Sequence, residues 1–351
     1  MKIAQIAPLC EAVPPRWYGG TERVVAHLTE ALIDAGFEVT LFASFDSRSR
    51  AKLVPCREQA LRLDASPLKS ENAAHLAMLH EVRRQADGFD ILHFHVDLLH
   101  YPLFEHLADR TLTTLHGRLD LVDLPALYKC WPQFPLVSIS HRQRQPLRGA
   151  RWFGTVHHGL PPELFRQGAG DGGYLAFLGR ISQEKRVDRA IRIAQRVGLP
   201  LKIAAKISDA DRCYYETQIE PLLDQPGIEF IGEIDDAAKQ DFLGRALALL
   251  FPIDWPEPFG IVMIEAMACG TPVIGWDCGA VPEVIDDGVS GRIVRSEDDA
   301  VRAVEAVARL DRAEVRAAFE RRFTAQVMAQ NYIELYWRLL RESGKSYRLS
   351  A

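Results

Sequence analysis

The chain alternates short apolar runs with amphipathic helical stretches, and it does so in both halves. The first apolar run, residues 2–8, precedes a helical stretch over residues 21–36, where Gly36 supplies a stop. Residues 37–43 form the second apolar run. Val- and Ile-rich strands that alternate with helices are typical of parallel sheets with helices on both faces. The pattern therefore predicts an α/β fold with two such units.

Both halves continue this rhythm before the pattern changes near the C-terminus. Further strands are expected at residues 90–95, 111–115, 135–140, 154–158, 174–179, 200–206, 228–233, 247–252 and 271–275. From Glu297 onward the pattern is helical without strands. Residues 157–173 are rich in Gly and Pro and are a candidate linker. We therefore expect domains at residues 1–160 and 172–324, followed by a helix within 325–351.

Length, charge and cysteine usage limit the class of protein. A chain of 351 residues favours two domains, and a net charge of -5 argues against a nucleic-acid partner. No apolar run has the length of a membrane-spanning helix, and the N-terminus lacks the pattern of a signal peptide. The six cysteines are scattered without a C-x-x-C pair. We expect a cytoplasmic protein with reduced thiols.

In each half, a turn with binding potential follows the first strand. The turn of the first half carries glycines, and that of the second half carries cations. Neither half carries G-x-G-x-x-G after its first strand, and G-x-x-x-x-G-K-[ST] is also absent. Gly19 and Gly20 precede a helix, where the backbone can approach an anion, although a simple turn would look the same. Arg180 ends a strand and Lys185 lies where the next helix begins. Two cations there suit a diphosphate, and the alternative is an ordinary charged surface.

Two glutamates bracket an almost wholly apolar run at residues 257–265. Carboxylates are seldom fully buried without a partner. Glu257 lies on a Pro-containing loop and Glu265 lies in the following helix, so both can face one cleft. A carboxylate that accepts two adjacent hydroxyls is the usual way to hold a ribose. The alternative is a capping glutamate with a chance buried carboxylate.

Taken together, these motifs resemble the retaining GT-B glycosyltransferases of glycosyltransferase family 4. The resemblance rests on E-x(7)-E, G-R-x(4)-K and a glycine pair before a helix, here at Glu257–Glu265, Gly179–Lys185 and Gly19–Gly20. It covers essentially the whole chain. It implies two Rossmann-like domains with parallel sheets facing a central cleft. The N-terminal domain would hold the acceptor, the C-terminal domain the sugar nucleotide, and the last helix would cross back to the N-terminal domain.

The resemblance assigns donor-binding roles. Arg180 and Lys185 would hold the diphosphate, and Glu265 would take the ribose hydroxyls. Glu257 would read the transferred sugar together with the backbone of Phe259, Gly260 and Ile261. Gly19 and Gly20 would lie near the diphosphate from the other domain.

The nucleotide base is assigned to a segment of the second half. It is expected near residues 231–235, beginning at Ile231. The family's glycine-rich turn is replaced here by residues 204–208, where Lys206 could reach a phosphate or the base edge. The donor nucleotide and sugar therefore stay open, with UDP-glucose as the default.

Histidines mark the acceptor side of the N-terminal domain. His116 matches a family position that contacts the donor sugar near the reacting carbon, and its alternative is a loop histidine bonded to a carbonyl. His93 and His95 have the spacing of metal ligands, but alternate residues of a strand face one side and can line an acceptor pocket. Ser140 and His141 are expected on the same side.

No essential metal and no cofactor are expected. Asp209-x-Asp211 mimics the metal-binding signature of another glycosyltransferase fold, but it lies in mid-chain and we interpret it as a helix-capping pair. The implied reaction moves a hexose from a nucleoside diphosphate sugar to an acceptor hydroxyl with retained configuration. Arg180 and Lys185 would stabilise the leaving diphosphate, with Glu257 and His116 at the sugar.

Two alternatives remain beside this reaction: a catalytically silent sugar-nucleotide-binding protein and a nucleotide-sugar epimerase of the same fold. A basic and aromatic stretch, residues 141–153, is either a solvated helix face or a peripheral contact with anionic membrane. The motifs name neither the acceptor nor an oligomeric state.

Overall fold

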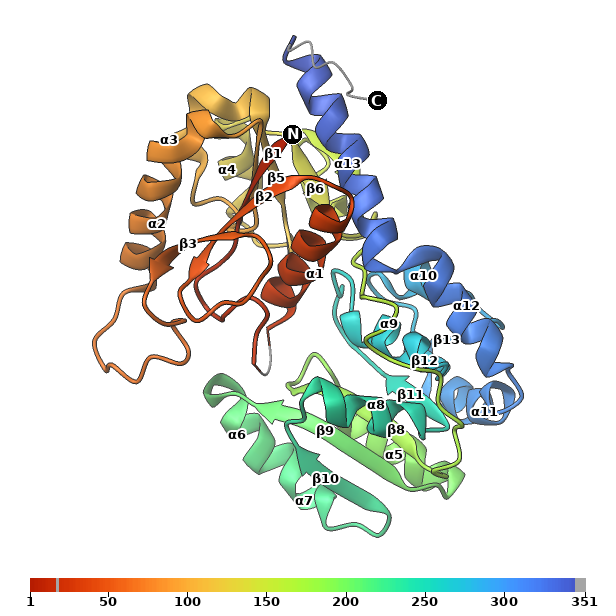
Figure 1. Cartoon of the computed structure of the whole chain (residues 1–351). Helices are drawn as coiled ribbons and strands as arrows, with labels where there is room; N and C mark the ends of the chain where they lie inside the picture. Colours follow the sequence, from red (N-terminus) through yellow and green to blue (C-terminus); the bar gives the residue numbers. More distant parts are fainter. Residues whose placement is uncertain (17–18, 345–351) are drawn as a thin grey trace. The chain divides into compact units, whose positions relative to one another are not determined.

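The computed structural model describes residues 1–16 and 19–344 and divides the chain into two compact units (Figure 1). Unit 1 comprises Met1–Gly159 and Ala325–Ala351, and unit 2 comprises Leu160–Thr324. The C-terminal helix thus belongs to the same unit as the N-terminal strand. In the part of the chain that the structure describes, no helix combines the length and apolarity that a membrane crossing requires.

Unit 1 is built on a seven-stranded parallel sheet in the order β3-β2-β1-β4-β5-β6-β7. Its strands are β1 (Lys2–Ile6), β2 (Glu38–Ser44), β3 (Lys52–Arg57), β4 (Ile91–Phe94), β5 (Thr111–Thr114), β6 (Leu136–Ser138) and β7 (Trp152–Thr155). Its helices are α1 (Gly20–Asp34), α2 (Glu71–Gln85), α3 (Tyr101–Phe104), α4 (Leu124–Cys130) and α13 (Ala325–Glu342). Gly36 has φ of 86° just after α1, which confirms the predicted stop.

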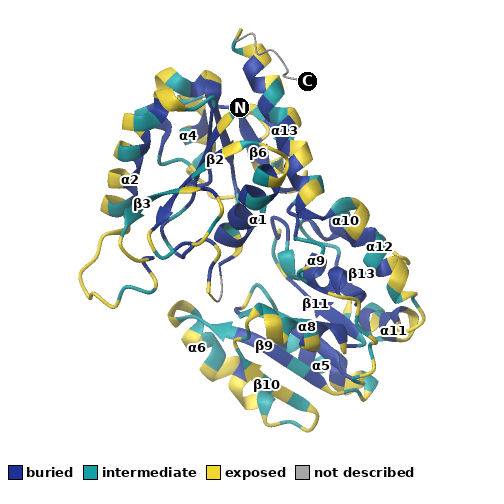
Figure 2. Cartoon of the chain, in the orientation of Figure 1, coloured by how far each residue is buried: buried dark blue, intermediate teal, exposed yellow. Residues whose placement is uncertain are grey.

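The middle of this sheet is buried on both faces. Every residue of β4 and β5 is buried, as expected for central parallel strands (Figure 2). Phe94 is fully buried and packs edge-on against Phe104, with ring centroids 4.9 Å apart. Burial of such a side chain contributes about 1.5–3 kcal/mol. The centre of unit 1 is therefore a rigid base for polar side chains carried by the same strands.

Unit 2 is built on a six-stranded parallel sheet in the order β10-β9-β8-β11-β12-β13. Its strands are β8 (Leu175–Ile181), β9 (Leu201–Ile207), β10 (Ile228–Gly232), β11 (Ala248–Phe251), β12 (Val273–Trp276) and β13 (Gly291–Val294). Its helices are α5 (Val187–Val197), α6 (Arg212–Tyr214), α7 (Glu220–Leu223), α8 (Asp236–Gly244), α9 (Ile261–Ala268), α10 (Val281–Val284), α11 (Glu297–Val307) and α12 (Arg312–Arg322). A one-turn π-helix, Tyr215–Ile219, separates α6 from α7.

The predicted α/β class with two parallel sheets is confirmed. Two strands were missed, β3 and β13, and both are edge strands. In β3 no residue is buried and Pro55 interrupts the sequence, so the apolar signal of a strand is absent. In β13 only four residues pair with β12. Neither edge strand has a continuous buried run, which leaves little hydrophobic pattern to detect.

Candidate active site

Arg180 lies on β8 and is held by two carboxylates of unit 2. Its Nε is 3.4 Å from Asp211 Oδ2, and its Nη2 is 3.8 Å from Glu184 Oε2. The Nε atom is buried, and no hydrogen bond to it is found among the residues that the structure describes. The sheet register pairs Arg180 with Lys206 of β9. Two of the predicted anion-binding cations are thus side by side on neighbouring strands.

Lys185 and Glu257 are brought into direct contact across 72 positions of sequence. The ammonium group of Lys185 donates a hydrogen bond to Glu257 Oε2. It also lies 5.2 Å from the ring centroid of Trp255 and 5.6 Å from that of Phe251. Trp255 Nε1 donates to the same carboxylate oxygen at 3.0 Å. The predicted phosphate ligand and the predicted sugar reader therefore form one ion pair in this structure.

Glu265 is buried on α9 with an ammonium group as its partner. Its side chain is 2% exposed, and its Oε1 accepts a hydrogen bond from Lys239 Nζ at 2.7 Å. Lys239 also lies 3.2 Å from Asp236. A carboxylate this deeply buried needs such a partner.

The turn before α9 requires a glycine at position 260. Gly260 has φ of 83°, a left-handed conformation that side chains seldom adopt. A Cβ there would lie 2.9 Å from Met263 Cε and 3.0 Å from Phe251 Cζ. Phe259 is buried beside it, with its ring 6.0 Å from that of Phe323. Ile261 begins the helix, so its amide is among the N-terminal donors that helix geometry leaves without an intrahelical acceptor.

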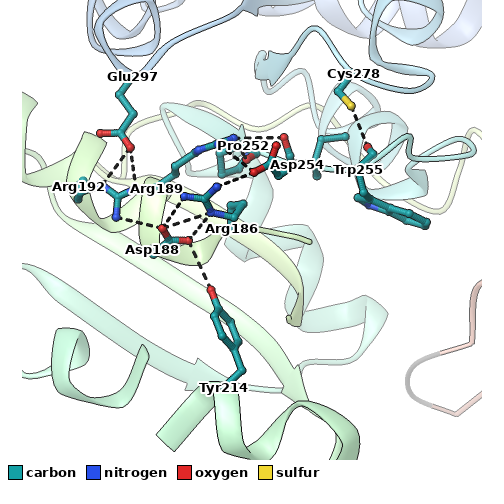
Figure 3. A network of polar contacts seen from close by, with 11 residues as sticks. Arg186, Asp188, Arg189, Arg192, Tyr214, Pro252, Asp254, Trp255, Cys278 and Glu297 are labelled. Atoms are coloured by element: carbon teal, nitrogen blue, oxygen red, sulfur yellow. Dashed lines mark hydrogen bonds and ion pairs between the residues drawn. The ribbon is translucent and has the colours of Figure 1, made fainter. Parts of the chain in front are cut away.

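A second set of ion pairs fastens the loop of Lys185 to the loop of Glu257 (Figure 3). Arg186, directly after Lys185, donates from Nη1 to Asp254 at 2.7 Å and from Nε to Asp188 at 3.0 Å. The backbone N–H of Asp254 donates to Glu184 O at 2.8 Å. Arg186 has φ of 54°, which is uncommon for a residue with a side chain. These contacts join the loop before α5 to the loop that carries Glu257.

The same network borders a cavity of about 650 Å³ within unit 2. Asp188 accepts from Arg186 and pairs with Arg192 Nη1 at 3.0 Å, and Tyr214 Oη lies 3.5 Å from its Oδ1 (Figure 3). Burial alone would raise the pKa of Asp188, but the hydrogen bonds from Arg186 and the charge of both guanidinium groups lower it below its ordinary value. The arginines and carboxylates labelled in Figure 3 are paired with one another.

The interpretation of Asp209-x-Asp211 as a helix-capping pair is confirmed only in the position of Asp211, which is the N-cap residue of α6. Both residues lie in a 3-10 turn, and neither side chain caps a helix. Asp211 instead accepts a hydrogen bond from Ser208 Oγ and pairs with Arg180. Ile231 lies on β10, which the order of the sheet places two strands away from β8.

In unit 1, the glycine pair stands at the start of α1. Gly19 is the N-cap residue and Gly20 is the first residue of the helix. A Cβ on Gly19 would lie 2.7 Å from Pro15 Cβ, so the backbone packs closely there. Glu22, in the first turn, accepts a hydrogen bond from the backbone N–H of Glu11, and its burial raises its pKa to about 7.

Two of the predicted acceptor-side histidines, His93 and His95, lie deep in unit 1. His93 is fully buried and His95 is 2% exposed, whereas His116 is partly exposed in the loop after β5. His95 Nδ1 and His116 Nε2 are 2.8 Å apart. Burial lowers the pKa of His116 to about 3 and that of His95 well below its ordinary value. The structure thus joins His95 to His116 by a hydrogen bond between neutral imidazoles.

Residues that the sequence did not single out complete this network. They are Gln5 of β1, Thr114 of β5, Tyr332 and Tyr336 of α13, and Gln143. Ser140 is buried and its Oγ accepts from the backbone N–H of Gln143 at 3.0 Å, while His141 is exposed. The missed residues are single polar residues within apolar strands and an apolar helix. The only sequence signal that could have found them is that their spacing places them on the buried face of each element.

One group of side chains in unit 1 has the proximity of metal ligands. Cys10, Glu71 and His75 offer ligand atoms within 4.8 Å of one another. Both ring nitrogens of His75 are engaged by backbone, however: Nδ1 by Glu71 O at 2.9 Å and Nε2 by the N–H of Leu9 at 3.1 Å. Binding a metal would break one of these hydrogen bonds, so a structural role in fixing the backbone explains this group better than a metal site does.

The basic stretch at residues 141–153 turns its aromatic side chains inward. Trp152 donates from Nε1 to Leu147 O at 2.8 Å. Phe153 is 4% exposed, and the guanidinium of Arg338 lies 4.0 Å above its ring. Arg142 and Arg148 are exposed. This surface is therefore basic without exposed aromatic anchors from Trp152 or Phe153.

Comparison with known proteins identifies relatives of both halves of the chain. The family described as "Glycosyl transferases group 1" matches residues 163–323, and the family described as "Glycosyltransferase Family 4" matches residues 18–157. A phosphatidyl-myo-inositol mannosyltransferase from Mycolicibacterium smegmatis is 27% identical, over 93% of this chain and 89% of that protein.

Solved structures share the fold over nearly the whole chain. Sucrose-phosphate synthase from Thermosynechococcus elongatus has a TM-score of 0.78 and 19% identity, covering 97% of this chain and 99% of that one. HepE from Anabaena, solved in complex with UDP and glucose, has a TM-score of 0.75 and 17% identity, covering 96% and 100%. The two family matches lie on the two units in turn, and the chain therefore belongs to the GT-B glycosyltransferases of family 4.

Proposed function

We propose that this glycosyltransferase moves a hexose from a nucleoside diphosphate sugar to an acceptor hydroxyl, with retained anomeric configuration and without a metal ion. Unit 2 would bind the donor through Arg180, Lys185, Glu257 and Glu265. Unit 1 would bind the acceptor. The contact between Lys185 and Glu257 carries the proposal, because it joins the cation predicted for the diphosphate to the carboxylate predicted for the sugar.

The ion pairs of unit 2 explain how one site could serve both groups. Arg180, Lys185 and Lys239 each contact a carboxylate. A diphosphate would offer these cations an alternative anion with stronger, charge-assisted hydrogen bonds. Once Lys185 turned to a phosphate oxygen, Glu257 would be released to accept a sugar hydroxyl. Diphosphate binding and sugar recognition would thus be coupled through one lysine.

The same cations supply the electrostatics of the reaction. When the bond between the anomeric carbon and the diphosphate oxygen breaks, negative charge develops on the leaving phosphate. Arg180, Lys185 and the amides at the start of α9 would stabilise that charge. Attack by the acceptor oxygen on the same face, assisted by the leaving phosphate, retains the configuration, and the acceptor proton passes to the phosphate. Glu257 then positions the sugar rather than attacking it.

The donor sugar is proposed as glucose or mannose. HepE was solved with UDP-glucose, which favours UDP-glucose as the first donor to test. The relatives named phosphatidyl-myo-inositol mannosyltransferase span most of this chain and favour mannose as the second. A purely donor-binding protein or an epimerase of the same fold would use the same nucleotide site.

The test is a donor panel with the purified chain. UDP-, GDP- and ADP-linked glucose and mannose are incubated with a mixture of hydroxyl acceptors, with and without EDTA, and the products are examined by NMR. We expect a new glycosidic bond with the anomeric configuration of the donor and no effect of EDTA. An inverted product, an epimerised donor, loss of transfer on chelation, or donor binding with neither transfer nor hydrolysis would contradict the proposal.

A further inference from the structure

A chain of hydrogen bonds in unit 1 links α13 to His116 through the sheet. Gln5 lies opposite His93 in the register of β1 and β4. Its Nε2 donates to Tyr336 Oη at 3.2 Å, and its Oε1 lies 2.8 Å from His95 Nε2. His95 Nδ1 continues to His116 Nε2 at 2.8 Å. Every member of this chain except His116 is buried.

The chemical character of each atom fixes the direction of this chain. A carbonyl oxygen only accepts, so His95 Nε2 must carry the proton that faces Gln5 Oε1. A neutral imidazole has one ring proton, and His95 Nδ1 is therefore an acceptor. His116 Nε2 must then be the donor of the bond between the two histidines. The remaining nitrogen of His116, Nδ1, keeps its lone pair.

The ring of His116 is also fixed in position. Gln143 Nε2 donates to Leu115 O and to Gly117 O, each at 2.8 Å, and so holds the backbone on both sides of the histidine. The imidazole stacks on His158 with ring centroids 5.3 Å apart. Its Nδ1 atom is buried, and among residues 1–16 and 19–344 nothing donates to it. A buried acceptor without a donor is costly, and a substrate group can supply the missing bond.

We propose that Gln5 and His95 are positioning residues that hold His116 as the Nε2–H tautomer, so that His116 Nδ1 accepts a hydrogen bond from a hydroxyl group of the sugar substrate. The sugar as ligand rests on the proposed function, but the tautomer does not. With this assignment, His116 Nδ1 can accept hydrogen bonds from O–H groups. It has no proton to offer a phosphate oxygen or a carbonyl from that nitrogen.

The structure provides an internal reference for the tautomer. His75 accepts at Nε2 from a backbone N–H and must donate from Nδ1 to a backbone carbonyl, so it is the Nδ1–H tautomer. The protein is labelled with 13C and 15N in histidine, and ring carbon shifts are recorded at pH 7. Signals are assigned by their loss in His116→Gln and His75→Gln. We expect His116 and His75 to show opposite tautomers.

Two variants test the role of Gln5. Gln5→Met removes the carbonyl acceptor, so His116 should change to a mixture of tautomers while His75 is unchanged. Gln5→Glu keeps a carbonyl oxygen toward His95 and should preserve the Nε2–H form. With a cognate donor and acceptor, kcat/KM of Gln5→Met should fall about 5- to 10-fold, as for one lost hydrogen bond, and that of Gln5→Glu should fall less.

The results separate this inference from the proposed function, because the tautomer is measured without any substrate. An Nδ1–H or protonated His116 at pH 7 overturns the inference, as does an unchanged His116 spectrum in Gln5→Met. If the tautomers are as expected but the chain transfers no sugar, the hydrogen-bond chain stands and the proposed function fails.

Discussion

The two units bury their polar side chains by different chemistry. In unit 2, Lys185, Lys239 and Arg180 are paired with carboxylates. In unit 1, the network below His116 consists of imidazole, amide and hydroxyl groups. All eleven histidines of the chain lie in unit 1 and none in unit 2.

Under the proposed function, this difference would match the ligand that each unit binds. Paired charges can exchange one anion for another, which suits a diphosphate. Neutral groups whose donor and acceptor atoms are fixed can hydrogen-bond to hydroxyl groups without attracting ions. Unit 2 is therefore expected to respond to the loss of a charge, and unit 1 to the loss of hydrogen-bond direction or to protonation.

The largest effect is expected from Arg180→Ala. Removal of one preorganised charge at the leaving group typically lowers turnover about 100- to 1,000-fold, and we expect this loss in kcat/KM for sugar transfer. Arg196→Ala is the control, because Arg196 pairs with Asp298 at an exposed position of α5. Equal rates for Arg180→Ala and Arg196→Ala would remove the charge-based account of unit 2.

Lys239→Met tests whether a buried carboxylate in unit 2 depends on its cation. Breaking a buried pair costs about 3–5 kcal/mol, and we expect about 2–3 kcal/mol here because Lys239 keeps 13% side-chain exposure. The loss of unfolding free energy is measured by urea unfolding, and hydrogen exchange of α9 shows whether the loss is local. Lys202→Met removes an exposed pair with Glu229 and should cost less than about 1 kcal/mol. The double variant with Glu265→Gln should recover stability, and failure to recover would argue against the pair.

Acid should destabilise unit 1 through its neutral histidines. The pKa of His116 is lowered to about 3, and those of His93, His95 and His158 are lowered well below the ordinary value. As pH falls below about 6.5, the unfolded chain binds protons that the folded chain does not, so stability falls by about 1.4 kcal/mol per pH unit for each histidine. The loss for His116 continues until about pH 3.

Glu22 changes stability with pH in the direction opposite to the histidines, and it is therefore replaced in the test. Its raised pKa of about 7 gives stability that is present at low pH and is lost as pH rises toward 7. In Glu22→Gln, hydrogen exchange should show falling protection of β4 and β5 between pH 6.5 and 5, with α9 changing less. Equal changes in β5 and α9 would contradict the difference between the units.

The smallest effect concerns the backbone at Arg186. Since Arg186 is in a left-handed conformation that costs about 1–2 kcal/mol for a residue with Cβ, Arg186→Gly should be more stable than Arg186→Ala by about 1 kcal/mol. Arg192, inside α5, gives the opposite order, with Gly about 0.5–1 kcal/mol less stable than Ala. Urea unfolding of the four variants measures both differences, and the same order at both sites would refute the strained conformation.

The sequence predicted the sheets and the charged motifs better than the contacts between them. The predicted central strands were found because short runs rich in apolar and β-branched residues recur between helical stretches, and Arg180 lies near the end of β8 as predicted. The partners of the charges were not predictable: Asp211 was interpreted as a cap, and Lys239 was not considered. A pair such as Lys239 with Glu265 forms between a helix and another helix 26 positions away, which no local spacing reveals.

In unit 1 the sequence predicted the strand that carries His93 and directly precedes His95, but it gave no indication of how deeply both histidines are buried. The bond from Gln5 to Tyr336 spans 331 positions and depends on α13 joining the N-terminal sheet. Polar residues on buried strands carry no sequence signal for their partners.

The most direct test of the difference between the units is calorimetric titration of UDP, GDP and ADP into wild type, Arg180→Ala and His116→Ala at two salt concentrations. We predict that wild type and His116→Ala bind a nucleoside diphosphate with similar affinity, and that Arg180→Ala binds at least tenfold more weakly with a smaller salt dependence. Undiminished binding by Arg180→Ala would contradict the account, as would a wild type that binds none of UDP, GDP and ADP.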